Sequence, residues 1–523
     1  MRRHGLTVVV LSLVLALALS GYALQGRAPA SGPRLFDEVL SVISDRFVDS
    51  TGSDELYEKA ARGLVEQLRD PYAELVSPKE LAAFDAQVAG RYAGLGLLVE
   101  DHEGRYFVGR VFPNTPGEHG GVQIGDRIVS VDGRQAGVLK FQEVTGSMKG
   151  APGTSVTVQF ERPGVAEPIT IRFTRAVIHI PGVPYALLLD GKIGYIPVQQ
   201  FTEKAGEEAE AAVARLQAQG ARGFVLDLRG DGGGYTDQAE RIANLFLAPG
   251  QEIYRVRTRA TAPEVHRATR SPLAPSAPVI VLTDGNSASA SEIVAGALQD
   301  HDRALVVGAP SFGKGLVQTG FPLDGGWLLK ITTGRWLTPS GRSIQKPRRL
   351  TQDGRLEEIP VDSADTAALG RARPVYHSDA GRVVYGGGGI TPDLLVAPDT
   401  IDSQAQALAR ALAPKSQEAY LALYDLATAV RPGLSPAFTV PPEWRADFYR
   451  RLEAHGVHVE QKVFDSAHTY VDRLIEQRVA RLAFGDSTAR RHSMDDDSPL
   501  RRALELLRGG HTQAEMFAAL PHS

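Results

Sequence analysis

Two stretches of this sequence share the same order of elements: a short apolar run, a loop of small residues and an amphipathic helix. The first has its apolar run at 223–228 and its loop at 229–234, and the second has its apolar run at 277–282. Short β-branched runs of this kind are typical of strands that are buried on both faces. A further apolar run at 303–308 completes a strand, helix, strand unit. The sequence therefore predicts an α/β core in which two loops follow buried strands.

A serine and a lysine stand out after the second of these strands. Ser289 lies in the run Ser-Ala-Ser-Ala-Ser-Glu at 287–292, and Lys314 follows 25 positions later between two glycines. A hydroxyl is a weak nucleophile until a base removes its proton, and a lysine can be that base only where burial lowers its pKa. The apolar neighbours Phe312 and Leu316 indicate a strand that enters the interior. We therefore expect the pKa of Lys314 to fall.

Both loops can offer backbone amides to a developing negative charge. Ser289 is expected at a strand-to-helix junction, where the unpaired N–H of Ala290 is a natural donor to an oxyanion. The loop at 229–234, Arg-Gly-Asp-Gly-Gly-Gly, can point bare amides at a ligand. An ordinary flexible turn is the alternative. A phosphate-binding loop is disfavoured because no Gly-Lys-Ser/Thr occurs there.

The neighbouring polar residues have simpler interpretations. Ser287 is interpreted as a turn residue, Ser291 as a helix-start residue, and Glu292 as a favourable charge at a helix N-terminus, worth a fraction of a kcal/mol. A Ser-His-Asp triad through His301 is the rival chemistry. It is disfavoured because an intervening helix would hold His301 roughly 15 Å from the start of that helix.

Four ordered segments, at 227–234, 287–292, 312–318 and 338–344, resemble the carboxyl-terminal processing peptidases, also called tail-specific proteases. The serine-to-lysine interval of that family matches Ser289 rather than its neighbours. The resemblance implies that the nucleophile is Ser289, the general base Lys314, and the residue that orients the lysine Gln318. It implies oxyanion-hole amides from Ala290 and from one of Gly233 or Gly234. For the core it implies a crotonase-like (ββα) fold.

An upstream region of short strands, 91–176, resembles a PDZ domain. Its carboxylate-binding loop would be formed by Gly94, Leu95, Gly96 and Leu97. In such domains a peptide end adds as a strand to a sheet edge while loop amides capture the terminal carboxylate. The resemblance therefore implies protein substrates with free, apolar C-termini. A small β-domain that only packs on the enzyme is the alternative, and 114–117, Asn-Thr-Pro-Gly, departs from the family's Ser-Pro-Ala.

The amino terminus predicts export. Residues 1–4 are basic, 6–19 contain no charge, and 21–23 offer a small-x-small cleavage site, so 1–28 is interpreted as a signal peptide or membrane anchor. The uncharged run extends over 6–24, which is near the length that spans a bilayer. Cleavage and retention both stay open. In either case the body is expected in the periplasm or on the extracytoplasmic face of the membrane.

Composition excludes several classes of site. The chain has no cysteine, so disulfides and thiol catalysis are excluded. The thirteen histidines are scattered, and neither a metal nor an organic cofactor is expected. With 523 residues, 43% apolar content and a net charge of −4, the chain can form several cores and shows no bias toward nucleic acid.

Five regions follow from these patterns. After the signal come an N-terminal helical region at 35–90, the PDZ-like domain at 91–176, the peptidase domain at 185–398, and a helical extension at 399–523. A polar insertion at 346–385 is interpreted as a surface excursion. The extension can pack on the peptidase, support an oligomer or hold an adaptor.

The sequence thus predicts an exported serine endopeptidase that cleaves proteins near their C-terminal tails with a Ser289–Lys314 dyad. An inactive tail-binding scaffold is one alternative. A crotonase-fold enzyme acting on acyl thioesters is another, disfavoured because such substrates are cytoplasmic.

Overall fold

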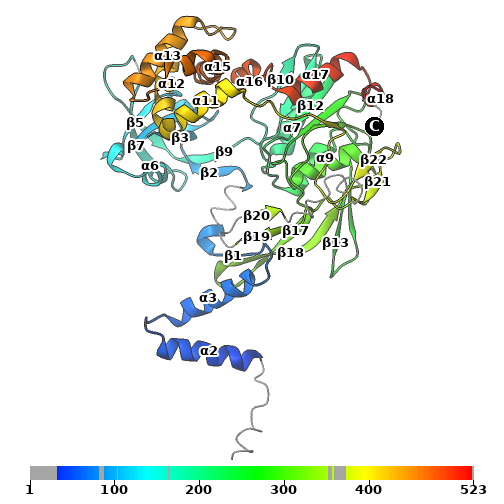
Figure 1. The fold of residues 1–523 in the computed structure, drawn as a ribbon. Helices are drawn as coiled ribbons and strands as arrows, with labels where there is room; N and C mark the ends of the chain where they lie inside the picture. The colour runs from blue at the N-terminus through cyan, green and yellow to red at the C-terminus, as the bar shows by residue number, and fades with distance from the viewer. Residues whose placement is uncertain are drawn as a thin grey trace, which may run out of the picture. The chain divides into compact units, whose positions relative to one another are not determined.

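The computed structural model describes residues 32–81, 88–102, 104–162, 164–351, 356–358 and 373–520 (Figure 1). The chain divides into two compact units. One combines the N-terminal part up to Val76 with Gly320–Ile331, and the other holds the remaining residues. The predicted signal or anchor at 1–28 lies outside the described residues. Among those that are described, no helix has the length and apolar character needed to cross a bilayer.

The first unit contains two helices and a short strand pairing. Helix α2 (Gly32–Arg46) and helix α3 (Ser53–Glu66) are amphipathic, as predicted, and strand β1 (Glu74–Val76) follows them. Strand β1 pairs antiparallel with residues 328–330 of β18 (Leu328–Leu337). The ammonium group of Lys330 forms an ion pair with Glu74 at 2.7 Å. Residues 82–87 of the predicted helical region at 35–90 lie outside the described residues.

The peptidase core is a six-stranded sheet in the order β10-β11-β12-β15-β16-β23. The strands are β10 (Leu187–Leu189), β11 (Ile193–Pro197), β12 (Gly223–Asp227), β15 (Val279–Thr283), β16 (Leu305–Gly308) and β23 (Leu394–Leu395). All pairs are parallel except β10 with β11. The three predicted apolar runs are therefore confirmed as neighbouring strands of one α/β sheet.

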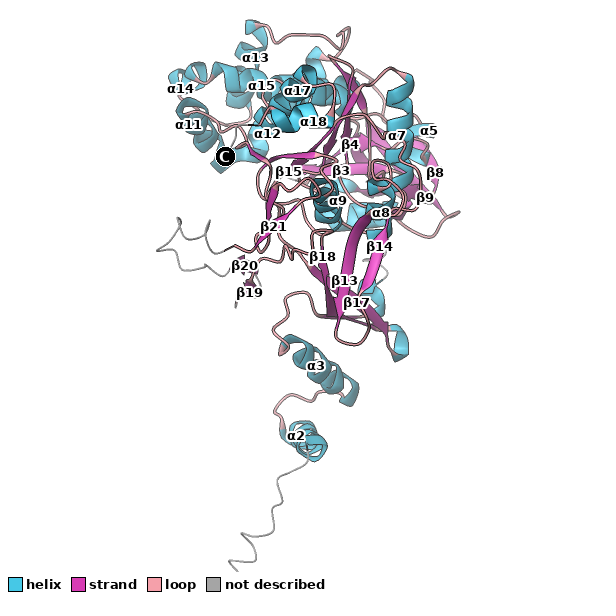
Figure 2. Cartoon of the chain, turned by 90° about the vertical axis from the view of Figure 1, so that its right-hand side faces the viewer, coloured by secondary structure: helices cyan, strands magenta, loops and turns pink. Residues whose placement is uncertain are grey.

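Helices cover both faces of this sheet. On one face lie α7 (Ala205–Ala218), α8 (Thr236–Ala243) and α9 (Ala290–Asp300), which pack against side chains such as Phe224 and Val281 (Figure 2). On the other face, Leu500 and Leu504 of α17 (Ser498–Gly509) pack against a cluster that includes Val225 and Ile280. Successive residues of a strand point to opposite faces of a sheet. Because both faces are covered here, residues of either orientation are apolar, and each strand is a continuous apolar run in the sequence.

A second sheet lies beside the core. Strand β13 (Glu252–Thr258) pairs with β14 (Glu264–Arg267) and with residues 334–337 of β18, and β17 (Leu316–Pro322) also pairs with β18. In the region interpreted as a surface insertion, the described residues form two short hairpins. These are β19 (Arg348–Leu350) with β20 (Leu356–Glu358) and β21 (Val375–His377) with β22 (Val383–Tyr385).

The region interpreted as a PDZ domain is a sheet in the order β3-β4-β5-β7-β8. Its elements are β3 (Leu97–His102), β4 (Arg105–Val111), α5 (Pro116–His119), β5 (Arg127–Val131), β6 (Arg134–Gln135), α6 (Phe141–Met148), β7 (Ser155–Glu161) and β8 (Ile169–Thr174). Strand β2 (Arg91–Gly94) pairs with β9 (Ala176–His179). Strand β3 is at the edge of the sheet and pairs only with β4 among the described strands.

The C-terminal extension is helical, as predicted. Its helices are α11 (Ser403–Leu412), α12 (Ser416–Val430), α13 (Pro442–Ala454), α14 (Gln461–Ser466), α15 (His468–Phe484), α16 (Asp486–His492), α17 and α18 (Gln513–Ala518). The core shared by α11 to α16 includes Phe107 of strand β4. The extension therefore packs on the PDZ sheet through α12 and α15 and on the peptidase sheet through α17.

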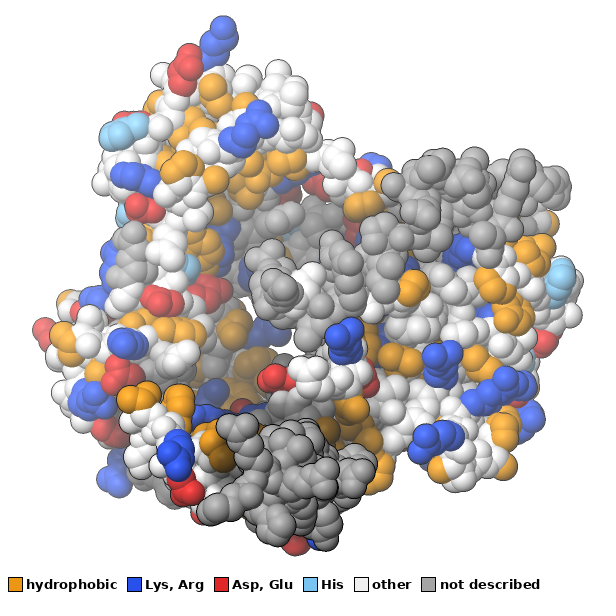
Figure 3. Space-filling view, turned by 60° about the horizontal axis from the view of Figure 1, so that its bottom comes forward, with side chains coloured by type: hydrophobic (Ala, Val, Ile, Leu, Met, Phe, Trp, Pro, Cys, Tyr) orange, Lys and Arg blue, Asp and Glu red, His pale blue; other side chains and the backbone are white. Residues whose placement is uncertain are grey.

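Charged side chains of both signs are interspersed with apolar ones on the face seen in Figure 3. This distribution matches the small net charge of −4.

Candidate active site

Ser289 occupies a sharp turn between strand β15 and helix α9. It is the N-cap residue of α9, and its backbone has φ 56° and ψ −111°. A positive φ is strained for a residue other than glycine, and such strain is concentrated at functional sites. Its side chain is partly exposed, whereas Ala288 and Ala290 on either side are buried. The predicted strand-to-helix junction is confirmed, and Ser289 is a partly exposed residue between two buried ones.

The two neighbouring serines have structural partners. Ser287 Oγ donates to the Leu228 carbonyl at 2.8 Å, and Ser291 Oγ donates to the Asp231 carbonyl at 3.1 Å. Both serines are fully buried. They therefore tie the serine segment to the glycine loop after β12 and are not available as nucleophiles.

Glu292 joins the serine segment to the lysine segment. Its Oε2 accepts hydrogen bonds from the backbone N–H of Ser289 at 2.9 Å and of Lys314 at 2.8 Å. Its Oε1 accepts from the Gly313 N–H at 2.6 Å and from Ser311 Oγ at 2.5 Å. Burial raises the pKa of this carboxyl group, while the four donors act in the opposite direction. The interpretation of Glu292 as a simple helix-end charge was incomplete.

Lys314 is thus held at its backbone beside Ser289. Its carbonyl accepts a hydrogen bond from the Trp336 indole N–H at 3.0 Å, and its side chain is half-buried. Gln318 lies on β17, and its Nε2 donates to Thr332 Oγ1 at 3.4 Å. Residues 316–318 of β17 are half-buried and residues 319–322 are exposed, so the strand runs outward from the interior. The prediction that this strand enters the interior was wrong.

The glycine loop after β12 lies directly against Ser289. A Cβ atom added to Gly233 would come within 2.7 Å of the Ala288 carbonyl and 2.9 Å of Ser289 Cβ. The Gly233 N–H donates to Asp231 Oδ1 at 2.8 Å. Within the described part of the chain, the N–H groups of Gly234 and Ala290 have no acceptor. Of the two glycine amides that the sequence left open, only that of Gly234 is unpaired.

Asp231 is a second buried carboxyl group beside the serine. Its side chain is completely buried, and its Oδ2 has no hydrogen-bond partner among the described residues. Burial raises its pKa to about 7, opposed by the hydrogen bond from the Gly233 N–H. Its backbone carbonyl also accepts a hydrogen bond from the Ala288 N–H at 2.9 Å. Nothing in the sequence distinguished Asp231 from an ordinary loop acid.

The far end of helix α9 has a structural role. His301 caps that end, where Nδ1 lies 2.7 Å from Asp379 Oδ2 and Nε2 lies 2.7 Å from the Glu252 carbonyl. The adjacent Asp300 lies 2.7 Å from the fully buried guanidinium of Arg342. The whole helix separates His301 from Ser289, so the structure excludes a triad through this histidine.

A cavity of about 680 Å³ lies between strand β3 and helix α6 of the PDZ region. It is lined mainly by apolar side chains, namely Tyr92, Leu95, Leu97, Leu98, Val99, Phe112, Phe141, Met148 and Ile180, with Arg91, Thr145 and Lys149. Of the four residues expected in the carboxylate-binding loop, Leu95 and Leu97 line this cavity, and Gly94 ends β2.

Gly96, the fourth of these residues, has φ +78°, and a Cβ there would lie 2.3 Å from Thr115 Cβ. Thr115 is part of the segment that departs from the family pattern. Its Oγ1 donates to the Phe112 carbonyl at 2.7 Å, so this segment buttresses the loop.

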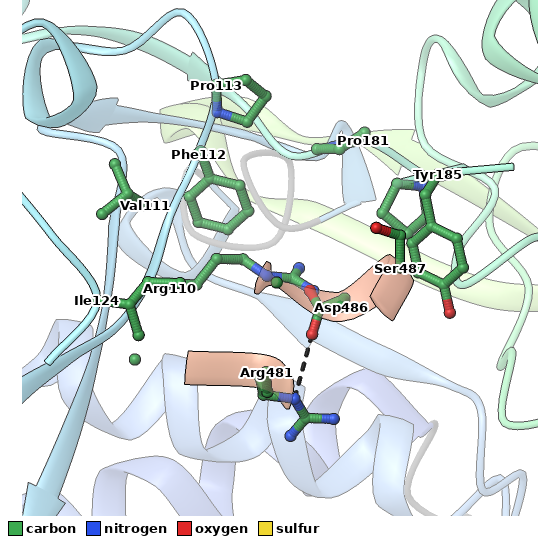
Figure 4. A pocket seen from close by; sticks show the side chains of 13 residues that line it. Arg110, Val111, Phe112, Pro113, Ile124, Pro181, Tyr185, Arg481, Asp486 and Ser487 are labelled. Atoms are coloured by element: carbon green, nitrogen blue, oxygen red, sulfur yellow. Dashed lines mark ion pairs between the residues drawn. The ribbon is translucent and has the colours of Figure 1, made fainter. Parts of the chain in front are cut away.

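A smaller cavity of about 210 Å³ lies where β4, residues 181–185 and the turn between α15 and α16 meet (Figure 4). Asp486 forms ion pairs there with Arg110 and, at 3.2 Å, with Arg481. The ion pair with Arg110 joins the extension to the PDZ sheet. Across the described ranges, no group of three or more His, Asp or Glu side chains is arranged to hold a metal ion.

Comparison with known proteins identifies the family. The model of peptidase family S41 matches residues 192–354, which include Ser289, Lys314 and Gln318, and the PDZ domain model matches 107–162. The carboxy-terminal processing protease CtpA of Bacillus subtilis is 31% identical over 345 residues, which are 65% of this chain and 73% of that protein. This chain belongs to the carboxy-terminal processing proteases. As a member of family S41, it is a serine-type peptidase.

Other relatives agree with this assignment. The carboxy-terminal-processing protease of Bartonella bacilliformis is 37% identical over 316 residues, covering 59% of this chain and 72% of that protein. Among solved structures, the photosystem II D1 C-terminal processing protease is 25% identical, with 72% of this chain and 96% of that chain covered and a TM-score of 0.36. The membership of this chain in the family rests on the sequence matches.

Proposed function

We propose that this processing protease is an exported endopeptidase that cleaves protein substrates near their C-terminal tails with a Ser289–Lys314 dyad. One observation carries the proposal: a single buried carboxylate oxygen, Glu292 Oε2, accepts the backbone N–H of both residues, at 2.9 and 2.8 Å. Two residues that share one acceptor atom lie side by side. The strained, partly exposed turn at Ser289 further supports its assignment as the nucleophile.

The reaction would begin with attack of Ser289 Oγ on the scissile carbonyl carbon while Lys314 Nζ takes the hydroxyl proton. The unpaired N–H groups of Ala290 and Gly234 would receive the negative charge on the carbonyl oxygen. Breaking of the C–N bond then releases the amine, which takes the proton from Lys314. In the second half, Lys314 activates a water that hydrolyses the acyl-enzyme, and Gln318 would orient the lysine. No step requires a metal or an organic cofactor.

Substrate tails would bind in the PDZ groove. Strand β3 has an open edge to which a peptide can add as a further strand, and the cavity between β3 and α6 is mainly apolar. The loop formed by Gly94, Leu95, Gly96 and Leu97 would capture the terminal carboxylate. An apolar C-terminal side chain would be buried against residues such as Phe141 and Met148.

Several finer features belong to the same proposal. We propose a crotonase-like core, for which the parallel sheet with α7, α8 and α9 on one face is the support. The uncharged run at 6–24 supports export and is the reason to place the body outside the cytoplasm, either anchored or released. The apolar side chains exposed on α2 are compatible with an oligomer. They are Leu35, Phe36, Val39, Val42 and Ile43.

The dyad is tested by turnover of a model protein that ends in an apolar tail with a free carboxylate. Ser289→Ala is expected to abolish cleavage, and Lys314→Ala to lower kcat by about 10³-fold, because a general base contributes 10²–10⁴-fold. Ser271→Ala and Lys204→Ala, at exposed positions away from the dyad, serve as matched controls. Equal turnover in all variants would refute the dyad.

The same assay separates a protease from a tail-binding scaffold. A scaffold would bind the tail in every variant and cleave in none. An amidated tail is expected to raise KM with little change in kcat, because amidation removes the carboxylate that the PDZ loop recognises. An unchanged KM would contradict the assigned role of that loop.

A further inference from the structure

A carboxylate of the C-terminal extension lies in the charge network at the start of the glycine loop. Asp497 accepts two hydrogen bonds from the guanidinium of Arg229, both at 2.8 Å, and one from Arg490 at 2.7 Å. All three side chains are largely buried, with 11–19% of their surface exposed. Although burial opposes ionisation, the bonds from Arg229 and Arg490 lower the pKa of Asp497 to about 2. Asp497 is therefore a charged partner of both arginines.

Arg229 contacts a second carboxylate with its other edge. Its Nε and Nη2 donate to the two oxygens of Asp227, at 2.8 and 2.7 Å, and its backbone N–H donates to the same side chain at 3.1 Å. Asp227 also accepts from Tyr195 Oη at 2.7 Å, and Arg490 Nε donates to that hydroxyl at 3.0 Å. Two arginines and two aspartates thus balance in charge, and Asp227 and Asp497 fix the guanidinium of Arg229 from both sides.

Arg229 is the first residue of the loop that reaches Ser289. The next residue, Gly230, donates its N–H to Asp284 Oδ1 at 3.1 Å, and Asp284 lies in the turn before the nucleophile. Further along, Gly233 packs against Ser289, and Gly234 carries the unpaired amide. The position of Arg229 therefore determines the position of the first residue of the loop that leads to the oxyanion site.

Asp497 is itself held rigidly. It caps helix α17 by accepting the Leu500 N–H at 3.0 Å, and α17 packs its leucines on the peptidase sheet. Arg490 comes from α16, which follows the turn that contacts the PDZ sheet. The carboxylate cannot follow if Arg229 moves, because its own backbone is fixed by the packing of α17.

We propose that Asp497 is a positioning residue of the peptidase: by fixing Arg229, it keeps the loop at 229–234 in the conformation that receives the oxyanion. The extension is then part of the catalytic unit and not a separate module. This inference rests on the proposed serine peptidase function.

Neutralising Asp497 would leave two buried guanidinium groups with one carboxylate. An uncompensated buried charge is strongly unfavourable, so Arg229 would rotate toward solvent and shift the loop. Small displacements of groups that stabilise the transition state lower turnover steeply. We expect kcat to fall at least about 10-fold. KM should stay within about 2-fold, because the tail binds to the PDZ groove elsewhere.

The test uses the full chain and the model substrate with the apolar tail. Asp497→Asn keeps an acceptor for the Leu500 N–H, so it removes charge while retaining the helix cap. Asp495→Asn, two residues away at an exposed position, makes the same chemical change outside the network and should behave as wild type. Wild-type kcat in Asp497→Asn would overturn the proposal.

A double variant separates positioning from stability. Asp497→Asn with Arg490→Gln restores the charge balance and the stability of the buried network while leaving Arg229 with one carboxylate. Its kcat should remain low, and recovery to the wild-type value would overturn the proposal. If Asp497→Asn alone fails to fold, the double variant still tests whether Asp497 positions Arg229. If the wild type and Ser289→Ala turn over the tailed substrate at the same rate, the proposed function is refuted, and the inference with it.

Discussion

Two buried carboxyl groups lie on opposite sides of Ser289, and their surroundings differ sharply. Glu292, on the lysine side, accepts four hydrogen bonds, three of them from backbone amides. Asp231, on the glycine-loop side, accepts one at Oδ1 from Gly233, and its Oδ2 has no partner among the described residues. Burial raises the pKa of both groups, to about 7 for Asp231. Glu292 therefore fixes backbone geometry, whereas Asp231 carries a buried oxygen that no described residue satisfies.

Removing the Glu292 carboxylate is expected to have the largest effect. Glu292→Ala leaves four donors without their acceptor, and each unsatisfied buried group costs about 1–3 kcal/mol. We expect a loss of at least about 4 kcal/mol in the free energy of unfolding and at least a 100-fold loss of kcat. Urea denaturation and turnover of the tailed substrate measure the two effects. Glu207→Ala, an exposed acid on α7, is the control. If Glu292→Ala and Glu207→Ala have the same stability and the same kcat, Glu292 does not fix the backbone at the site.

Asp231→Asn tests the other carboxyl group through pH. The pKa of Asp231 is about 7 in the folded protein and near 3.9 in an unfolded chain, so between these values only the folded state holds the proton. The wild type therefore loses stability as pH rises from about 4 to about 7, by up to about 4 kcal/mol. Asp231→Asn has no carboxyl group at this position, so it does not show this pH-dependent loss of stability.

The free energy of unfolding of Asp231→Asn, relative to wild type, should thus increase between pH 4.5 and pH 8, as followed by urea denaturation. A change in the free energy of unfolding that the new amide causes equally at both pH values cancels in that comparison. Parallel pH dependences for the two proteins would show that Asp231 is not protonated in the folded state near neutral pH.

A smaller effect is expected from a methyl group on the glycine loop. Gly233→Ala introduces a Cβ 2.7 Å from the Ala288 carbonyl, at a residue whose φ is +97°. Such strain costs about 1–3 kcal/mol, and the shifted loop should lower kcat at least about 10-fold. The adjacent Gly232→Ala meets no atom within 4 Å and should change stability by less than about 0.5 kcal/mol. Similar kcat values for Gly233→Ala and Gly232→Ala would show that turnover does not depend on the close packing of residue 233 against Ser289.

The sequence predicted much of the fold. The strands at 223–228, 277–282 and 303–308, the junction at Ser289 and the helical character of the extension all follow from local periodicity, which the structure confirms. The assignments of Ser287 to the turn, of Ser291 to the helix start and of His301 to a place beyond the helix also followed, because each depends on residues close in the chain. The carbonyls that bind the two serine hydroxyls lie 59 and 60 residues away and were not predicted.

The contacts of three acids were not predictable. Glu292 stands in the first turn of a helix, Asp231 in a glycine loop and Asp497 in a run of three aspartates, and each position has an ordinary local explanation. Their partners lie 21 and 22 residues away for Glu292 and 268 residues away for Asp497. For Asp231 the deciding feature is the missing partner of Oδ2, which no sequence pattern encodes.

By itself, the sequence determined the order of strands and helices, the loop that carries Ser289, and the family to which the chain belongs. These depend on residue types at short spacing. Only the tertiary structure decided which loop amides lack a partner among the described residues, which carboxyl group joins the serine to the lysine, and that the extension contacts the glycine loop. The physical reason is that burial and hydrogen bonding depend on which segments pack together, and parallel strand order brings distant segments to one edge of the sheet.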